Sequence, residues 1–145
     1  MRILVTGNLG YVGTIASSYL RNQGFDVVGL DSGFYKECLL SPIENEVVTN
    51  IKDIRDIETK DFYGVEAVVH LAALSNDPIG ELDQALTFEV NYKGAVRVAE
   101  LAKSAGVKKF VFVSTQSIYG ISSSNEELGE DDSLKNPQTA YASSK

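Results

Sequence analysis

The stretch Val5-Thr6-Gly7-Asn8-Leu9-Gly10-Tyr11-Val12-Gly13 decides the fold of this chain. Its glycines recur at every third position, directly after the apolar run Ile3-Leu4-Val5 and directly before a helical pattern. A strand, a glycine-rich turn and a helix in this order are typical of a dinucleotide-binding loop. An ordinary glycine-rich turn is the alternative, and the place behind an N-terminal strand favours the loop.

Each glycine is expected to have its own task in such a loop. Because it lacks a Cβ atom, Gly7 allows a tight turn, Gly10 lets the backbone approach a pyrophosphate, and Gly13 lets the helix pack close to the strand. The free amides and the positive dipole end of the helix would face the phosphates. We therefore expect cofactor contacts along the whole loop, from Gly7, Asn8, Leu9, Gly10, Tyr11, Val12 and Gly13.

The spacing of the loop also points to a family. It is Thr-Gly-x-x-Gly-x-x-Gly rather than G-x-G-x-x-G, and this form resembles the extended branch of the short-chain dehydrogenase/reductase superfamily. That branch contains nucleotide-sugar epimerases, dehydratases and reductases. The resemblance covers the whole chain in five segments, and it implies an NAD-binding Rossmann domain.

Length and composition limit the alternatives. The chain has 145 residues, enough for one domain, and a formal net charge of −7, which argues against nucleic acid and anionic membranes as partners. No apolar run approaches the roughly 20 residues that a membrane-spanning helix needs. The single cysteine, Cys38, cannot form an internal disulfide, which fits a cytoplasmic protein. We expect no metal site.

Five apolar runs predict a doubly wound parallel α/β sheet with strand order 3-2-1-4-5. The expected strands are Arg2–Val5, Val27–Leu30, Glu46–Thr49, Glu66–His70 and Phe110–Val113. The expected helices are Tyr11–Asn22 and Leu82–Ala105. By the resemblance, further strands and a substrate region would follow, so we expect a Rossmann domain that is incomplete at its C-terminus.

Two acidic residues that follow strands are candidate adenosine contacts. Asp31 ends the second strand, where an acid accepts hydrogen bonds from the ribose hydroxyls and repels the extra phosphate of NADP. The resemblance implies that Asp53 and Ile54 contact the adenine. Asp53 could instead cap the short helix that runs towards Phe62.

The segment His70-Leu71-Ala72-Ala73 resembles the family's His-x-Ala-Ala segment. There, small residues let the backbone lie along the cofactor, which makes Leu71, Ala72 and Ala73 candidate contacts. His70 has apolar neighbours and no orienting group, so we expect a buried, hydrogen-bonded histidine rather than a base. The polar loop from Ser75 to Pro78 follows at the strand's carboxyl end, where ligands bind, and Ser75 and Asn76 are candidate substrate contacts.

The helix expected over Leu82–Ala105 has two apolar lines. One has helical spacing, and a second line beside it widens the apolar face beyond what packing on a sheet requires. The resemblance implies contact with a second subunit, and a well-buried helix in a monomer is the alternative. Asn91 matches a helix asparagine of the family and is expected to be structural. The two lines are Ala95, Val98, Ala99 and Ala102, and Phe88, Tyr92 and Val96.

The segment Ser114–Gly120 resembles the family's Ser-Ser-x-x-Val-Tyr-Gly segment. Matched from its last two residues backwards, it places Thr115 at the catalytic hydroxyl position and Ser114 beside the cofactor. Gln116 and Ser117 are then candidate substrate contacts. A nucleotide-sugar 4,6-dehydratase would carry Asp-Glu after the threonine, so this pair argues against that subgroup.

Tyr141 and Lys145 form a Tyr-x-x-x-Lys pair. Side chains four apart share one face of a helix, and a nearby cation favours the phenolate that a tyrosine base needs. Tyr141 would take the proton of a sugar hydroxyl while hydride moves to the nicotinamide. Thr115 would hydrogen-bond the same oxygen. By the resemblance, Lys145 also holds the nicotinamide ribose.

The sequence therefore predicts an NAD-dependent nucleotide-sugar epimerase, dehydratase or reductase. Two alternatives stay open: an NAD-dependent dehydrogenase of another alcohol, and a catalytically silent dinucleotide sensor. We expect the 145-residue chain to be a fragment that binds NAD weakly through its adenosine end. It should not catalyse redox chemistry, because Tyr141 and Lys145 would lie on a loose terminus.

Overall fold

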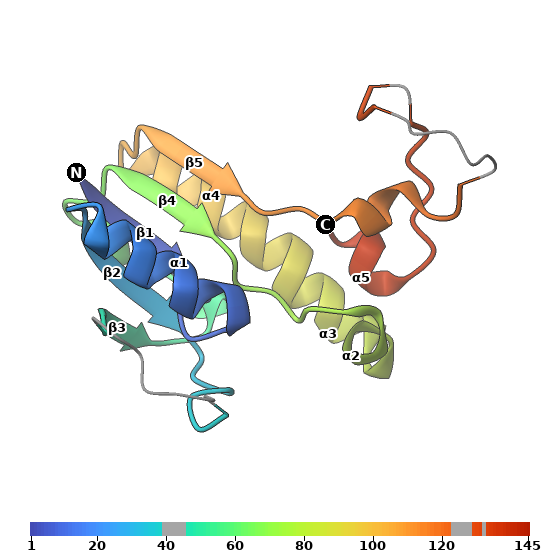
Figure 1. Cartoon of the computed structure of the whole chain (residues 1–145), viewed down its shortest axis with the longest axis horizontal. Coiled ribbons are helices and arrows are strands. Elements are labelled where there is room, and N and C mark those ends of the chain that lie inside the picture. The colour runs from blue at the N-terminus through green and yellow to red at the C-terminus, as the bar shows by residue number, and fades with distance from the viewer. Residues whose placement is uncertain (39–45, 123–128, 132) are drawn as a thin grey trace.

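The fold is a five-stranded parallel sheet in the order β3-β2-β1-β4-β5, which confirms the predicted order (Figure 1). The computed structural model describes residues 1–38, 46–122, 129–131 and 133–145. Four residues of β1 are buried, as expected for a central strand covered on both faces. The strands are β1 Arg2–Thr6, β2 Asp26–Asp31, β3 Val48–Ile51, β4 Ala67–His70 and β5 Lys109–Phe112.

The third strand begins two residues later than predicted, at Val48 instead of Glu46. Its register is set by β2, against which it pairs from Val28↔Val48 to Asp31↔Ile51. The carbonyl of Glu46 lies outside this ladder and accepts a hydrogen bond from Arg21 Nη1 at 2.7 Å. The third strand also ends two residues later, at Ile51 instead of Thr49, and the boundaries of the other four strands differ from the prediction by one residue at most.

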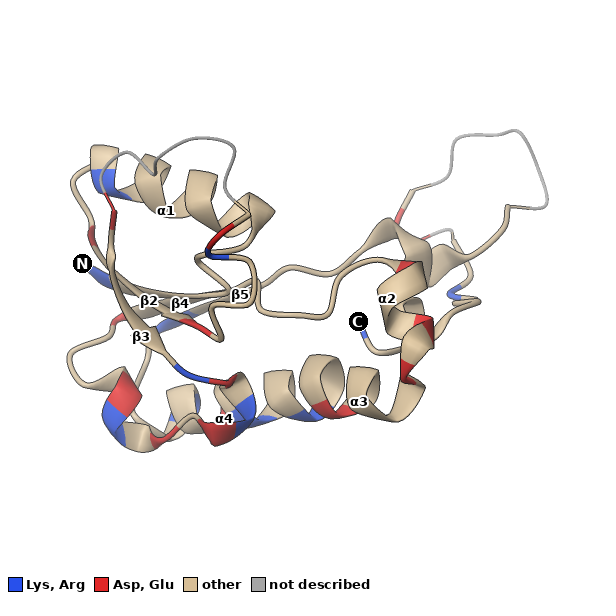
Figure 2. Ribbon diagram, turned by 90° about the horizontal axis from the view of Figure 1, so that it is seen from below, with Lys and Arg blue, Asp and Glu red and all other residues tan. Residues whose placement is uncertain are grey.

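Helices cover both faces of the sheet (Figure 2). Helix α1 (Tyr11–Asn22) has the predicted bounds and lies on one face. The other face is covered by α4 (Ala95–Ser104) and a π-helical segment η3 (Glu89–Gly94), and α3 (Gln84–Phe88) lies beyond the end of the sheet. The α4 side holds the larger buried cluster, which contains Leu4, Leu30, Ile54, Ile57, Phe62, Val65, Val68, Val98 and Ala102.

The single helix predicted over Leu82–Ala105 is wrong. Leu82 ends a separate helix, α2 (Asp77–Leu82), and Asp83 is extended with φ −149°. The Asp83 carboxylate accepts a hydrogen bond from Leu86 N at 2.9 Å and so caps a new helix, α3. Helix α2 begins inside the segment predicted as a polar loop, at Asp77, because Asn76 caps it and Pro78 fits its first turn.

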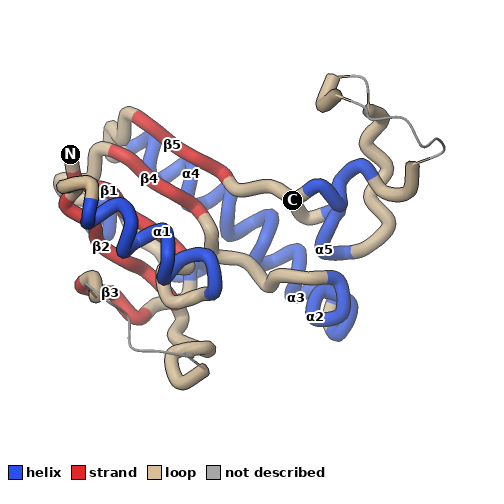
Figure 3. Tube along the Cα trace, viewed as in Figure 1, coloured by secondary structure: helices blue, strands red, loops and turns tan. Residues whose placement is uncertain are grey.

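Short helical segments lie beyond the carboxyl ends of the strands, as Figure 3 shows for α2 and α5 (Ala140–Ser143). A 3-10 turn, η4 (Gln116–Tyr119), follows β5 and packs against α5. Two more, η1 (Ile54–Asp56) and η2 (Thr59–Phe62), follow β3. In the parts of the chain that the structure describes, no helix is long and apolar enough to cross a membrane.

Candidate active site

The turn at Gly7 has the geometry predicted for a dinucleotide loop. Gly7 has φ +75°, a conformation that glycine adopts without strain, and its amide donates to Leu30 O at 2.8 Å. A Cβ atom at this position would lie 2.7 Å from the backbone nitrogen of Ala72. Only glycine therefore lets the chain turn between β2 and the segment that follows β4.

Gly13 lies against the glycine turn that follows β1. A Cβ atom on Gly13 would lie 2.0 Å from Gly7 O and 2.7 Å from the Cα atom of Asn8. The absence of a side chain thus brings the first turn of α1 against the glycine turn. The turn itself lies between the end of β1 and the first turn of α1.

The start of α1 is open to an anionic group. Gly10 is the residue before the helix, no side chain caps α1, and its first turn holds no acidic residue. The amides of a first helical turn have no acceptor within the helix. Tyr11 and Val12 are exposed, with 87% and 57% of their surface accessible. These residues fit a pyrophosphate, which the dipole of α1 would stabilise.

Asn8 and Leu9 are buried in the loop. Asn8 is 2% exposed, its Nδ2 donates to Thr49 Oγ1 at 2.8 Å, and a Cβ atom on Gly29 would lie 2.3 Å from its side chain. The Asn8 side chain therefore points towards β2 and β3 and not to the start of α1. Only the backbone of Asn8 remains for the predicted cofactor contact.

Asp31 is held in place by backbone amides. Its Oδ2 accepts from Leu9 N at 3.0 Å and its Oδ1 accepts from Gly33 N at 2.7 Å. The first bond ties the end of β2 to the glycine loop. Because each carboxylate oxygen has a second lone pair, the side chain can still accept bonds from ribose hydroxyls.

Asp53 caps a short helix, the alternative that the sequence left open. Its side chain accepts from Arg55 N at 2.8 Å and pairs with Arg55 Nη2 at 2.7 Å. The hydrogen bonds from the Arg55 side chain lower the pKa of Asp53. Ile54 is 5% exposed and packs in the core, where a Cβ atom on Gly94 would lie 2.8 Å from it. An adenine contact by Asp53 and Ile54 stays a prediction.

His70 is the buried, hydrogen-bonded histidine that the sequence predicts. It is inaccessible to solvent, and its Nδ1 shares a hydrogen bond with Thr6 Oγ1 at 2.7 Å. Its ring stacks on those of Phe110 and Phe112, with centroids 6.2 and 5.9 Å away. Burial, with a smaller effect of the Lys145 cation, lowers the pKa of His70 to about 4. The ring is therefore neutral near pH 7.

The segment behind His70 runs beside the glycine turn. Leu71 N donates to Thr6 O at 3.0 Å, and Ala72 N approaches Thr6 Oγ1 at 3.5 Å. Leu71, Ala72 and Ala73 are all half-buried. Their backbone thus lies at the carboxyl edge of the sheet next to Gly7, where a dinucleotide would pass in an open α/β sheet.

Asn91 joins this segment to the end of the chain. Its Oδ1 accepts from Leu74 N at 2.8 Å, and its Nδ2 donates to Leu74 O and to Ser144 Oγ, each at 3.1 Å. Asn91 is 1% exposed and lies in the π-helical segment η3. A π-turn inside an α-helix often marks a functional region. The structural role predicted for Asn91 is thus a bridge between the segment after β4 and α5.

Thr115 precedes η4 and is half-buried. Its Oγ1 accepts from Ser117 N and donates to Ser117 Oγ, both at 3.2 Å. Ser114 and Gln116 are exposed and Ser117 is half-buried. Since η4 packs against α5, the structure brings Thr115 and Tyr141 to the same end of the sheet.

Tyr141 lies in a well-anchored helix, so the expected loose terminus is wrong for this residue. Ala140 and Ala142 are buried, and Thr139 caps the helix by accepting from Ala142 N at 3.1 Å. Helix α5 ends at Ser143, however, and Lys145 lies beyond it. The shared helical face of Tyr141 and Lys145 stays a prediction.

Lys145 lies against the end of β5. Its ammonium nitrogen is 4.7 Å from the centre of the Phe112 ring, within the range of a cation–π contact. Burial lowers the pKa of Lys145. Since Phe112 also stacks on His70, a continuous stack links the lysine to the carboxyl end of β4.

The candidate substrate residues Ser75 and Asn76 are exposed. Asn76 has φ +76°, and it is the one such non-glycine residue in the described ranges 1–38, 46–122, 129–131 and 133–145. Its side chain accepts from Ile79 N at 3.1 Å and caps α2. Such a backbone strain is frequent at functional sites.

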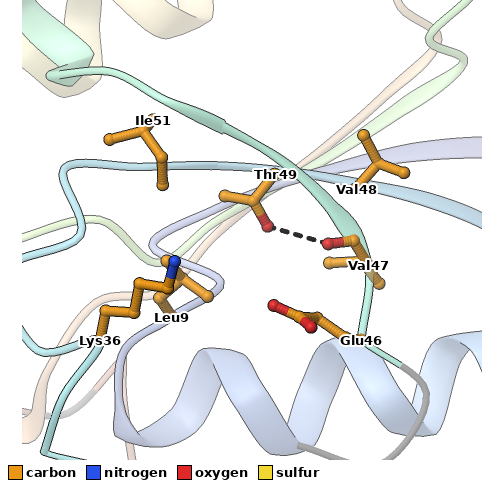
Figure 4. A pocket seen from close by; sticks show the side chains of 7 residues that line it. All are labelled: Leu9, Lys36, Glu46, Val47, Val48, Thr49 and Ile51. Atoms are coloured by element: carbon orange, nitrogen blue, oxygen red, sulfur yellow. Dashed lines mark hydrogen bonds between the residues drawn. The ribbon is translucent and has the colours of Figure 1, made fainter.

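A pocket of about 370 Å³ lies beside the glycine loop (Figure 4). Leu9, Lys36 and four residues of the β3 segment line it, together with Glu46. Figure 4 shows the Lys36 amine and the Glu46 carboxylate on the same side of β3. Thr115, Tyr141 and Lys145 are not among its lining residues, so this pocket is separate from the predicted catalytic groups.

A family model described as "NAD dependent epimerase/dehydratase family" matches residues 3–145. The chain belongs to this family. A UDP-glucose 4-epimerase from Mycolicibacterium smegmatis is 34% identical over 100% of this chain and 48% of its own length. The extended short-chain dehydrogenase/reductase resemblance is thereby confirmed.

Solved structures give the same result. A Thermus thermophilus UDP-glucose 4-epimerase in complex with NAD is 32% identical, with a TM-score of 0.83 over 99% of this chain and 47% of that one. A Streptomyces venezuelae dTDP-glucose 4,6-dehydratase with NAD bound is 30% identical, with a TM-score of 0.86 over 99% of this chain and 48% of that one. The chain thus spans about half the length of these relatives.

Proposed function

We propose that this chain is the NAD-binding part of a nucleotide-sugar epimerase or dehydratase. The observation that carries the proposal is the glycine turn at Gly7. This turn places the uncapped start of α1 beside the carboxylate of Asp31, which Leu9 N holds in place. The relatives, among them enzymes solved with NAD, support the same cofactor and substrate class.

The adenosine end of NAD would bind along the glycine loop. The open amides at the start of α1 would hold the pyrophosphate, and Asp31 would accept bonds from the adenosine ribose. The backbone from Leu71 to Ala73 would lie along the next part of the cofactor. NAD, when bound, accepts a hydride from the sugar carbon and returns it.

The chain's own residues would manage the proton. Tyr141 would take it from the sugar hydroxyl, and Thr115 would hydrogen-bond the same oxygen. Lys145 would hold the nicotinamide ribose and favour the phenolate of Tyr141 through its charge. Ser114 would contact the cofactor beside them.

Substrate contacts would come from Ser75, Asn76, Gln116 and Ser117. The pair Gln116-Ser117 stands where a 4,6-dehydratase would carry Asp-Glu, which favours an epimerase. Because the chain spans about half the length of its relatives, we propose that further residues complete the substrate site in a longer protein.

The second apolar line of the long helical region would contact a second subunit. Phe88, Tyr92 and Val96 are 36%, 56% and 41% exposed, whereas Val98 and Ala102 of the first line are buried. We expect Tyr92→Lys to lower the dimer fraction in sedimentation without unfolding the chain. An unchanged association state would exclude this surface as the contact.

Turnover with Tyr141→Phe tests the proposed chemistry. Loss of the proton-transfer group should lower turnover of UDP-glucose or dTDP-glucose by about two to four orders of magnitude in a protein that contains this chain and completes the site. NAD affinity should change little. The 145-residue chain, assayed beside it, should show no turnover.

Two results would contradict the proposal. Near-normal turnover by the Phe variant would mean that another residue is the base. NAD retained without turnover of any nucleotide sugar or other alcohol by the protein that completes the site would indicate a dinucleotide sensor.

A further inference from the structure

Two carboxylates of α2 bind the start of the helix that carries Tyr141. Thr139 Oγ1 donates to Asp77 Oδ1 at 2.6 Å, and Ala140 N donates to Glu81 Oε1 at 2.7 Å. Asp77 and Glu81 are four residues apart, so they lie on one face of α2. Helices α2 and α5 lie in contact beyond the carboxyl edge of the sheet.

These bonds meet a need of α5. The first amides of a helix have no acceptor inside it, and helices this short are marginal without tertiary support. Thr139 takes the amide of Ala142, and Glu81 takes the amide of Ala140. Negative charge at this end is also favoured by the dipole of the helix.

Packing between the two helices is close enough to fix their distance. A Cβ atom on Gly80 would lie 3.0 Å from the Cβ atom of Tyr141 and 3.2 Å from its backbone nitrogen. Gly80 thus lets α2 touch the backbone of Tyr141 directly. The two carboxylates then set the direction in which α5 leaves this contact.

The carboxylate of Glu81 is itself oriented by α2 and α3. Gln84 Nε2 donates to its second oxygen at 2.6 Å. The buried hydroxyl of Thr87 donates to Gly80 O at 2.8 Å and to Asp83 O at 2.9 Å, which ties the end of α2 to α3. The Glu81 carboxylate that binds α5 is therefore itself tied to α3.

We propose that Asp77 and Glu81 are positioning residues that hold Tyr141 and Lys145 towards the cofactor and substrate. They act on the first turn of α5, while Asn91 holds its far end through Ser144. This inference rests on the proposed function of Tyr141 and Lys145. It gives α2 a task in the reaction that is separate from any substrate contact by Ser75 and Asn76.

The test compares Asp77→Ala/Glu81→Ala with Asp77→Asn/Glu81→Gln in the 145-residue chain. The second pair keeps an acceptor oxygen at each site and should restore the wild-type behaviour. Glu100→Ala, at an exposed glutamate of α4, removes a similar charge and is the control.

The first readout is hydrogen exchange at the amides of Ala142, Ser143 and Ser144, whose bonds define α5. The Ala pair should raise their exchange rates by at least about tenfold, as expected when charge-assisted hydrogen bonds are lost. Amides of β1 and β4 should keep their protection, which shows that the sheet is folded. Unchanged exchange in α5 would overturn the proposal.

The second readout is the affinity for NAD relative to ADP. ADP reports the glycine loop and Asp31, so the extra affinity of NAD reports the Lys145 end. In the Ala pair the ratio of NAD affinity to ADP affinity should fall at least about fivefold, a change of about 1 kcal/mol in binding free energy, while the ADP affinity stays the same. Faster exchange in α5 with an unchanged ratio would overturn the positioning role.

Failure of the proposed function gives a different result. A wild-type chain that binds NAD no better than ADP would contradict the role of Lys145. Exchange in α5 would then still decide whether Asp77 and Glu81 hold the helix.

Discussion

The glycine loop is held in place mainly through backbone amides and carbonyls, whereas helix α5 is held in place by side chains of other elements. Gly7 and Asp31 are fixed by amides and carbonyls of neighbouring strands and turns. Helix α5 is held by Asp77, Glu81 and Asn91, more than 50 residues away in the sequence. The glycine loop is therefore built into the sheet, and helix α5 is joined to it through side-chain hydrogen bonds from distant segments.

This difference predicts how each region responds to substitution. A change in the glycine loop should damage stability and cofactor binding together, because the same backbone serves both. A change around α5 should affect the nicotinamide end and leave the sheet intact.

Gly7→Ala should have the largest effect on the loop. Alanine at φ +75° is strained, and its Cβ atom would lie 2.7 Å from the backbone of Ala72. We expect the free energy of unfolding to fall by about 4 kcal/mol and NAD and ADP affinity to fall together.

Gly24→Ala is the matched control in urea unfolding. Gly24 has φ +84°, but a Cβ atom there would meet nothing within 4 Å. Its cost should therefore be the backbone strain alone, about 1 to 2 kcal/mol. Equal losses for the two variants would show that the close approach to Ala72 has no weight.

His70 lies between the two regions, and its burial predicts a pH dependence. The folded-state pKa of about 4 is below the ordinary value of 6.5, so between these values only the unfolded chain takes up the proton. The free energy of unfolding should be fully retained above pH 6.5 and fall by up to about 3 kcal/mol towards pH 4.

His70→Leu should flatten this dependence. Urea unfolding between pH 6.5 and 5 is the measurement, since carboxylates that titrate at lower pH contribute little in that window. Parallel curves for the variant and the wild-type chain would mean that His70 is not held neutral in the folded state.

Asn91→Ala should loosen helix α5. It removes the three hydrogen bonds to Leu74 and Ser144 and leaves the half-buried backbone groups of Leu74 without these partners. We expect a loss of about 2 kcal/mol in the free energy of unfolding. NAD should lose affinity relative to ADP.

Asn50→Ala is the control for Asn91→Ala, because Asn50 is exposed and makes one bond, to Asp61. It should change stability by less than about 0.5 kcal/mol. If Asn91→Ala were equally mild, the bridge between the β4 segment and α5 would not matter.

The smallest expected effect is the difference in affinity between NAD and NADP. The Asp31 carboxylate, fixed by Leu9 and Gly33, should repel the extra phosphate of NADP. We expect NAD to bind at least about tenfold more tightly, or roughly 1.4 kcal/mol. Titration of both cofactors decides this, and equal or tighter NADP binding would contradict the role of Asp31.

The backbone-built region could be predicted from the sequence. Glycine spacing and apolar runs predicted the bounds of α1, the turn at Gly7 and the positions of the strands, because these depend on local conformation and on a sheet buried from both sides, and the strand order followed from the dinucleotide-binding fold that the resemblance implies. Buried His70 could be predicted from its apolar neighbours. The partner of Gly13 could not, since the fold of the turn decides it.

The region around α5 was harder to predict. The break at Asp83 depends on a capping bond inside an otherwise helical pattern. Glu81 was not singled out, because Asp77 was placed in the predicted loop from Ser75 to Pro78 and no helix was predicted that would put the two residues on one face. Their bonds to Thr139 and Ala140 join distant segments, which spacing along the chain does not reveal.

The most direct test of the account is an NMR titration of the 145-residue chain with NAD. We predict saturable shifts at the amides of Gly7, Gly10, Val12 and Asp31, together with smaller shifts at Lys145. The absence of saturable binding, or shifts confined to the pocket beside Lys36 and Glu46, would contradict the proposed cofactor site.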